Sequence, residues 1–190
     1  MSLLFLNVTG LSNSGELHWQ SIWEKANPTQ LLRVQQDNWE EPHKDDWIIR
    51  LNETIQQQEQ HIVLIAHSLG CLTVAHWANR FPSQKIEAAL LVAPPDVNRT
   101  EEFAIIESFS PVPTQALPFP SLVIASTNDE YASIERSEEM AQAWGSDFIN
   151  LGAFGHINAT TNLGLWEEGQ ALLKQLLTKS AIETTLLFES

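Results

Sequence analysis

Residues 61–70 are HIVLIAHSLG, and this stretch decides the fold. Its first six residues form a nearly continuous apolar, β-branched run, which is typical of a central parallel strand buried on both faces. Directly after it, residues 69–78 carry apolar side chains at helical spacing. We therefore predict a buried strand, a sharp turn at Ser68 and a helix that ends at Phe81-Pro82.

The rest of the chain alternates short apolar runs with longer amphipathic stretches, which is the pattern of βα units around a parallel sheet. Further strands are predicted at residues 3–8, 31–34, 88–92, 121–125 and 147–151, and helices at residues 18–26, 45–58, 134–144 and 166–177, with a short helix within 100–109. The proline-rich segment Pro111 to Pro120 is predicted to be an extended loop. The segment after Lys179 either frays or forms a second short helix.

Size and composition are those of an ordinary globular protein. The chain has 190 residues, 43% of them apolar and 18% charged, with no repeat, low-complexity tract or shift in composition, so we expect a single domain over residues 1–190. Ten Lys and Arg against 24 Asp and Glu give a net charge of −14, which repels nucleic acid and anionic membrane surfaces.

The expected location is the cytoplasm. The apolar run at residues 3–8 is too short to span a membrane and lacks the basic start and cleavage site of a signal peptide. Cys71 is the only cysteine, so the chain forms no internal disulfide, and we expect Cys71 to pack in the core.

Ser68 stands where the buried strand turns into the helix, with small residues two positions away on either side, Ala66 and Gly70. This is the pattern of a nucleophile elbow, in which a strained backbone lifts the serine hydroxyl clear of the sheet. The common motif has Gly at the position of Ala66, so the match is incomplete, and a serine that only caps the helix is the alternative. The strand-to-helix placement favours the nucleophile.

A serine hydroxyl needs a base within hydrogen-bond reach, and the base needs an acid that orients it. In folds with this elbow the acid and then the histidine follow the nucleophile, each on a loop after a later strand. Asp129 and His156 meet both conditions and leave the same sheet edge as Ser68. Asp96 also follows a strand, and Glu130 adjoins Asp129, so both are reserve candidates for the acid.

The remaining histidines lack a catalytic context in the sequence. His18, His43 and His61 are interpreted as loop or surface residues, and His76 lies on a predicted helix. His67 precedes the nucleophile, and we expect its side chain to point away from Ser68 and to support the site by packing or hydrogen bonding.

The oxyanion of an acyl-transfer intermediate needs backbone donors. The amide of Leu69, which opens the helix after Ser68, is the first candidate. The second is the amide of Leu11, in the loop after the first strand, although another amide after Gly10 could replace it. No metal-ligand spacing and no Gly-rich phosphate loop occur, so no cofactor or metal is expected.

The seven tryptophans are predicted to lie mainly in the core, because several have amphipathic spacing: Trp19, Trp23, Trp39, Trp47, Trp77, Trp144 and Trp166. Trp39 is the one in a predicted loop, which leaves a role in a substrate pocket open for it.

Taken together, these residues resemble the retinoblastoma-binding-protein/YdeN family of small serine hydrolases, a minimal branch of the α/β-hydrolases. The resemblance covers nearly the whole chain and rests on five segments: GELHWQ (15–20), QDNW (36–39), DW (46–47), AHSLGC (66–71) and GHINA (155–159).

The resemblance implies a parallel sheet of about six strands with helices on both faces and little or no lid. It also implies that Ser68, Asp129 and His156 correspond to the family's triad. Family members often have Pro directly after the aspartate, where this chain has Glu130, which bears on the geometry of the acid loop.

The first hypothesis for the function is a carboxylesterase that cleaves small esters through an acyl-enzyme on Ser68. An amidase or aminopeptidase with the same triad is a second hypothesis, in which Glu130 or Asp96 would hold a substrate ammonium. The third is a protein-binding module with a weakly active triad, and it predicts an inaccessible or mispaired Ser68.

Overall fold

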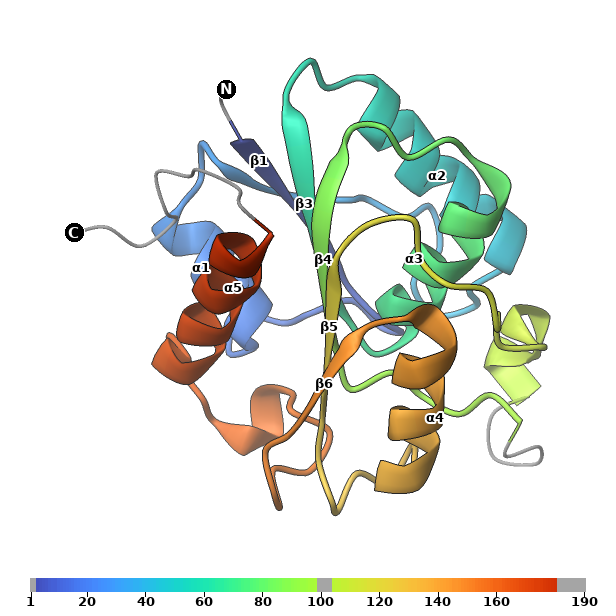
Figure 1. Ribbon diagram of the computed structural model, residues 1–190, viewed down its shortest axis with the longest axis vertical. Coiled ribbons are helices and arrows are strands. Elements are labelled where there is room, and N and C mark those ends of the chain that lie inside the picture. The colour runs from blue at the N-terminus through green and yellow to red at the C-terminus, as the bar shows by residue number, and fades with distance from the viewer. Residues whose placement is uncertain (1–2, 99–103, 181–190) are drawn as a thin grey trace.

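The computed structural model describes residues 3–98 and 104–180 and contains a sheet of six parallel strands flanked by helices (Figure 1). The strand order is β2-β1-β3-β4-β5-β6. The strands are β1 (Leu3–Val8), β2 (Leu31–Arg33), β3 (His61–His67), β4 (Ile86–Val92), β5 (Ser121–Ala125) and β6 (Asp147–Asn150). The helices are α1 (Trp19–Ala26), α2 (Lys44–Gln56), α3 (Leu69–Arg80), α4 (Ile134–Trp144) and α5 (Glu167–Lys179), and η1 (Ala104–Phe109) and η2 (Ala159–Thr161) are short 3-10 helices. The predicted α/β fold is confirmed.

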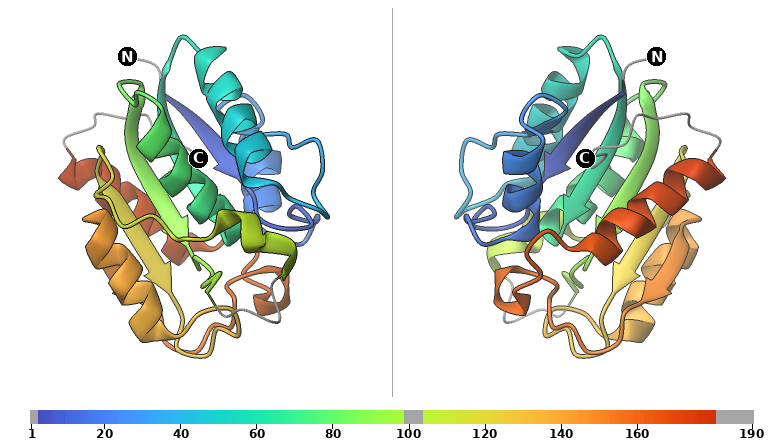
Figure 2. Two further views of the ribbon diagram at one scale, coloured as in Figure 1. Left: turned by 90° about the vertical axis from the view of Figure 1, so that its right-hand side faces the viewer. Right: turned by 90° about the vertical axis from the view of Figure 1, so that its left-hand side faces the viewer.

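The sheet separates two hydrophobic cores. Helices α1 and α5 cover one face, and α2, α3 and α4 cover the other (Figures 1 and 2). Successive residues of β3 belong to different cores. Leu64 lies in the core formed with α2 and α3, whereas Val63 and Ile65 lie in the core that contains the tryptophans of α1. Because β3 lies between β1 and β4 and is buried on both faces, its sequence is almost continuously apolar.

The aromatic side chains lie mostly where the sequence predicts them. Five tryptophans are among the largest fully buried side chains: Trp19, Trp23, Trp47, Trp77 and Trp144. Trp39 is only partly buried, but it packs edge-on against Trp47, with ring centroids 5.6 Å apart, and joins the core. Trp39 is not among the residues that line the cavity at Ser68, so the structure gives no support to the pocket role left open for it. Cys71 is buried in the same core, and burial raises the pKa of its thiol, so it packs as an apolar side chain.

The predicted loops need two adjustments. Of the helix expected within residues 100–109, the structure has the 3-10 helix η1, and the earlier part lies outside the described residues. The proline-rich loop is not a solvated linker, because Val112, Leu117 and Phe119 are buried and Trp144 Nε1 donates a hydrogen bond of 2.8 Å to Pro113 O. The segment after Lys179 lies almost entirely outside the described residues.

Over residues 3–98 and 104–180, none of the helices has the length and apolar character needed to cross a membrane.

Candidate active site

Ser68 occupies a strained turn between β3 and α3. Its backbone has φ 54° and ψ −126°, a region that residues other than glycine rarely adopt. Two backbone bonds hold it there: Ser68 N donates to Val92 O at 2.9 Å, and Cys71 N donates to Ser68 O at 2.9 Å. This is the geometry predicted for a nucleophile elbow, because it directs the side chain away from the sheet.

Gly70 allows α3 to start directly against the end of β1. A Cβ atom at Gly70 would lie 2.0 Å from Val8 O and 2.8 Å from Val8 C, and both atoms belong to the backbone. No side-chain rotation can relieve such a contact. The close approach of helix and strand at the elbow therefore requires glycine at this position.

We expect Gly70→Ala to lower the stability of the fold by about 3 kcal/mol or more, since the added methyl group overpacks a backbone contact. For a chain of this size that corresponds to a fall in melting temperature of roughly 6–12 °C, measured by circular dichroism. Gly15→Ala is the matched control, because a Cβ there would meet no atom within 4 Å. Equal melting temperatures for the two variants would contradict the proposed contact.

The three residues singled out for chemistry lie in one hydrogen-bonded chain. Ser68 Oγ is 2.8 Å from His156 Nε2, and His156 Nδ1 is 2.9 Å from both Oδ1 and Oδ2 of Asp129. The side chains of His156 and Asp129 are only 7% and 4% exposed. With the imidazole proton on Nδ1, that proton is donated to Asp129, and Nε2 accepts from the Ser68 hydroxyl. This arrangement can activate a serine as a nucleophile.

The hydrogen-bond partners of the carboxylates distinguish the candidates for the acid. Asp129 also accepts a hydrogen bond of 2.9 Å from Tyr131 N, which fixes the carboxylate toward His156. Asp96 instead accepts from Arg136 Nε at 3.3 Å and from Asn98 N at 3.2 Å. Of Asp129, Asp96 and Glu130, the structure therefore brings Asp129 to the histidine, as the sequence favours.

The loop that carries His156 is fixed by side chains from the neighbouring loop. Asn128 Oδ1 accepts from Gly155 N at 2.7 Å, and Ser126 Oγ accepts from Phe154 N at 2.9 Å. Ser126 and Asn128 belong to the loop that carries Asp129. Their hydrogen bonds therefore fix the loop of the base relative to the loop of the acid.

His67 supports the base from the other side, as expected. Its Nε2 lies 2.9 Å from His156 O, so it donates to that carbonyl and holds the His156 backbone. The imidazole of His67 is buried, and burial, reinforced by the nearby His156 and His18, holds its pKa well below the usual range. It is a neutral donor in the folded protein.

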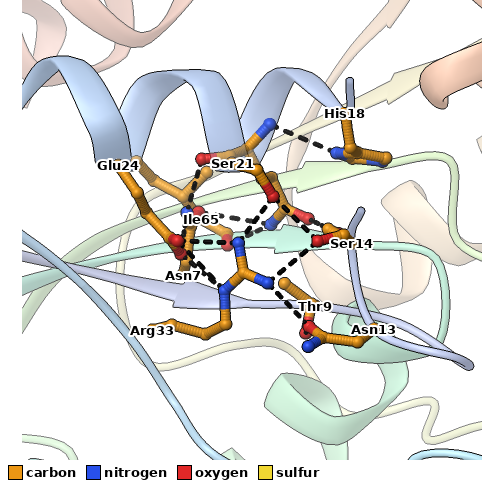
Figure 3. Close-up of polar contacts among 10 residues, drawn as sticks. Asn7, Thr9, Asn13, Ser14, His18, Ser21, Glu24, Arg33 and Ile65 are labelled. Atoms are coloured by element: carbon orange, nitrogen blue, oxygen red, sulfur yellow. Dashed lines mark hydrogen bonds and ion pairs between the residues drawn. The ribbon is translucent and has the colours of Figure 1, made fainter. Parts of the chain in front are cut away.

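His18 corrects the sequence interpretation. It lies in the loop before α1, as one of the two expectations has it, but it is only 5% exposed and not a surface residue. It caps α1 by accepting from Gln20 N at 3.2 Å (Figure 3). It also lines the pocket at Ser68. Its ring lies edge-on to His67, with centroids 4.6 Å apart. Burial, and secondarily the charge of Arg33, lower the pKa of His18 to about 4. The sequence predicts a helix from residue 18, whereas α1 begins at Trp19 and His18 is its cap residue.

The depressed pKa of His18 predicts a pH-dependent stability. An unfolded histidine titrates near 6.5, so between pH 6.5 and pH 4 the unfolded chain binds more protons at this position, and stability falls as the pH falls. His18 alone should make the protein about 2 kcal/mol less stable at pH 5 than at pH 7.5. Urea denaturation at both pH values measures this difference.

His18→Asn isolates that contribution, because asparagine keeps a cap acceptor but does not titrate. We expect the stability difference between the two pH values to shrink by the same amount in this variant. An unchanged difference would show that His18 is not held neutral by its surroundings.

A cavity of about 360 Å³ opens above Ser68. It is lined by the loop after β1, the elbow and the loops that carry Tyr131 and His156. Among the described residues its wall contains no Asp, Glu, Lys or Arg side chain. The same residues, 3–98 and 104–180, contain no group of three His, Cys, Asp or Glu side chains that could hold a metal ion. The described part of the cavity wall is therefore uncharged apart from its histidines, which can carry charge only when protonated.

Leu69 and Leu11, whose amides are predicted to bind an oxyanion, both line this cavity. Leu69 is the first residue of α3, so its amide has no partner within the helix. Leu11 also lines the cavity, and the loop that carries it is close to the elbow: a Cβ at Gly10 would lie 2.8 Å from Ser68 Cβ and 3.3 Å from Leu69 N. The assignment of Leu69 and Leu11 stays a prediction.

Comparisons with known proteins identify the family of this chain. Residues 5–175 match the family described as serine hydrolase. The chain is 34% identical to a YdeN-like hydrolase from Pectobacterium atrosepticum, with a TM-score of 0.82, covering 95% of this chain and 92% of that one. The ydeN gene product of Bacillus subtilis is 15% identical, with a TM-score of 0.71 over 94% of this chain and 100% of that chain. No match was found among curated proteins.

A more distant solved structure shows the same fold. Est1E from Butyrivibrio proteoclasticus, solved with ferulic acid bound, is 14% identical, with a TM-score of 0.70 over 94% of this chain and 90% of that chain. The extent of the family match and the identity to the Pectobacterium protein decide the assignment. The chain belongs to the serine hydrolase family and is a YdeN-like small serine hydrolase of the α/β-hydrolase superfamily.

Proposed function

We propose that this protein is a carboxylesterase that hydrolyses small, neutral esters, with Ser68 as nucleophile, His156 as general base and Asp129 as the acid that orients it. The observation that carries the proposal is the continuous chain of hydrogen bonds from Ser68 Oγ through the His156 ring to Asp129, at the wall of an open cavity. These distances are the ones that acyl transfer requires, and they support the three proposed roles.

In the first half of the reaction, Ser68 Oγ bonds to the ester carbonyl carbon while its proton passes to His156 Nε2. The carbonyl oxygen becomes an oxyanion that the amides of Leu69 and Leu11 would stabilise. When the intermediate collapses, the bond to the alcohol oxygen breaks and His156 returns the proton to that oxygen. The products are a free alcohol and an acyl-enzyme on Ser68.

In the second half, water gives a proton to His156 Nε2 and bonds to the acyl carbon. The second tetrahedral intermediate collapses, the bond to Ser68 Oγ breaks, and His156 returns the proton to Ser68. The carboxylic acid leaves and the enzyme is restored. Asp129 stays ionised throughout and stabilises the imidazolium that forms twice in each turnover.

The pocket wall favours an ester over a cationic peptide substrate. An aminopeptidase needs a carboxylate that holds the substrate ammonium, and Asp96 is instead paired with Arg136. Neither Asp96 nor Glu130 lines the cavity. The binding-module alternative requires a mispaired or covered Ser68, whereas Ser68 lines the cavity with its hydroxyl 2.8 Å from His156 Nε2.

The proposal is tested with a panel of p-nitrophenyl esters from acetate to decanoate, together with the matching p-nitroanilides. We expect kcat/KM to be highest for the short esters, because a cavity of about 360 Å³ lies near the lower end of the range for ligand sites. The anilides should be cleaved far more slowly. Preferential cleavage of anilides, or of an amino-acid anilide with a free ammonium, would support the amidase alternative instead.

A further inference from the structure

Arg33, the last residue of β2, forms hydrogen bonds through all three nitrogens of its guanidinium group (Figure 3). Nε donates to Glu24 Oε1 at 2.8 Å, and Nη2 donates to Glu24 Oε2 at 2.6 Å and to Ser21 Oγ at 2.7 Å. Nη1 donates to Asn13 Oδ1 and to Ser14 O, both at 2.9 Å. The side chain is only 13% exposed. Arg33 thus joins α1 to the loop that follows β1.

The anchor on the α1 side is rigid. Glu24 Oε1 also accepts a hydrogen bond of 2.7 Å from Asn7 Nδ2, and Asn7 is a fully buried residue of β1. Asn7 Nδ2 donates in addition to Gln20 O at 3.0 Å. Because the Glu24 carboxylate is fixed to the sheet, Arg33 transmits the position of β1 and β2 to the loop.

The loop itself is strained and needs such support. Ser12 and Asn13 both have positive φ angles, 57° and 63°, in a run of two residues that are not glycine. Backbone of this kind persists only where the surroundings hold it. Asn13 N donates to Gly10 O at 3.1 Å, and Thr9 Oγ1 donates to Asn13 Oδ1 at 3.0 Å. Asn13 Oδ1 therefore accepts from Arg33 and from the start of its own loop.

This loop is also the one that reaches the nucleophile. Gly10 approaches the elbow so closely that a Cβ there would lie 2.8 Å from Ser68 Cβ. Leu11 follows Gly10 and lines the cavity beside Leu69. A small shift of the loop would therefore change the distance between the Leu11 amide and a reacting carbonyl.

We propose that Arg33 is a positioning residue for oxyanion stabilisation. Through Asn13 and Ser14 it fixes the strained loop that presents the Leu11 amide to the reacting carbonyl. The proposal rests on the proposed function, since it assigns Arg33 a part in stabilising the same transition state. It predicts that Arg33 contributes to kcat rather than to substrate binding.

The test compares Arg33→Lys with Arg136→Lys in the full chain, using p-nitrophenyl acetate as substrate. Arg136→Lys weakens ion pairs with Asp96 and Glu139 that lie outside the loop network. Arg33→Lys loses the two bonds that Nη1 donates to Asn13 Oδ1 and Ser14 O. We expect Arg33→Lys to lower kcat by roughly 10- to 100-fold with KM within about twofold, because misplacing one oxyanion donor costs part of its full effect. Arg136→Lys should keep kcat within about threefold, even where its melting temperature falls by as much as that of Arg33→Lys.

A transition-state probe separates positioning from general loosening. Phenylboronic acid forms a tetrahedral adduct on an active-site serine, so its inhibition constant should weaken in Arg33→Lys by about the same factor as kcat. The pH at which kcat/KM is half-maximal should stay that of the native chain, since His156 and Asp129 are untouched. A purely structural role would not move the boronate affinity in step with kcat.

A double-mutant cycle tests the path through Asn13. Asn13→Gly keeps the positive φ accessible but removes one of the two loop acceptors of Arg33 Nη1, leaving Ser14 O. If Arg33 acts mainly through the Asn13 side chain, the combined variant loses little more activity than the larger single variant. Losses that multiply would contradict the path through Asn13.

These experiments distinguish failure of the Arg33 proposal from failure of the esterase proposal on which it rests. A native chain that neither cleaves p-nitrophenyl acetate nor reacts with a fluorophosphonate overturns the esterase proposal and, with it, the role of Arg33. If the native chain is active, the positioning role alone is overturned by either of two results. One is equal kcat losses in Arg33→Lys and Arg136→Lys that follow melting temperature, and the other is unchanged boronate affinity in Arg33→Lys.

Discussion

Replacing Ser68 with alanine is expected to lower kcat for p-nitrophenyl acetate by roughly 10⁴- to 10⁶-fold, because no acyl-enzyme can form without the hydroxyl. The fold should be retained, since Ser68 is held through backbone bonds to Val92 and Cys71 that alanine also makes. The strained φ of 54° is as accessible to alanine as to serine. The measurement is the steady-state rate together with the melting temperature.

Ser83→Ala is the control for this variant. Ser83 precedes β4, outside the residues that line the cavity, and should leave kcat and KM unchanged. A Ser68→Ala protein that keeps more than about one hundredth of the native rate would point to another nucleophile or to catalysis without a covalent step.

The second large effect is expected for Asp129→Asn. The amide can donate its own proton to His156 Nδ1, which stabilises the tautomer with the proton on Nε2, and that tautomer cannot accept the proton of Ser68. We expect kcat to fall by about 10⁴-fold with little change in KM, because the substitution is isosteric and acts on proton transfer.

Asp96→Asn is the matched control, because Asp96 is the other aspartate that follows a strand at this edge of the sheet. It pairs with Arg136 and not with His156, so the variant should retain kcat within about twofold and lose only the modest stability of a partly exposed ion pair. The reverse ranking of the two variants would reassign the acid.

The central part of the fold was predictable because burial alone explains most of its sequence. The run at residues 61–66 is apolar on both faces since β3 lies between two strands and two helical layers, and a helix can follow it only through a sharp turn. Chain order then placed Asp129 and His156, because parallel strands end at one edge of a sheet.

Boundaries and buried polar groups were harder to predict. Strand β2 ends at Arg33, one residue earlier than predicted, and Arg33 turns its side chain into a network formed by residues from β1, α1 and the intervening loop. Its partners lie 9 to 20 positions away, a spacing that no local pattern marks. The burial of His18 was missed for a related reason. A histidine at the start of a helix is compatible with either an exposed turn or a buried cap, and its burial here depends on contact with His67, which is distant in sequence.

Labelling with a fluorophosphonate probe, followed by mass spectrometry of the modified peptide, tests the central claim most directly, because it needs no knowledge of the substrate. The native chain should form one covalent adduct on Ser68, while Ser68→Ala forms none and His156→Ala reacts at least about 100-fold more slowly, since the hydroxyl then lacks its base. A native chain that stays unlabelled, or an adduct on a residue other than Ser68, would contradict the assignment of Ser68 as an activated nucleophile.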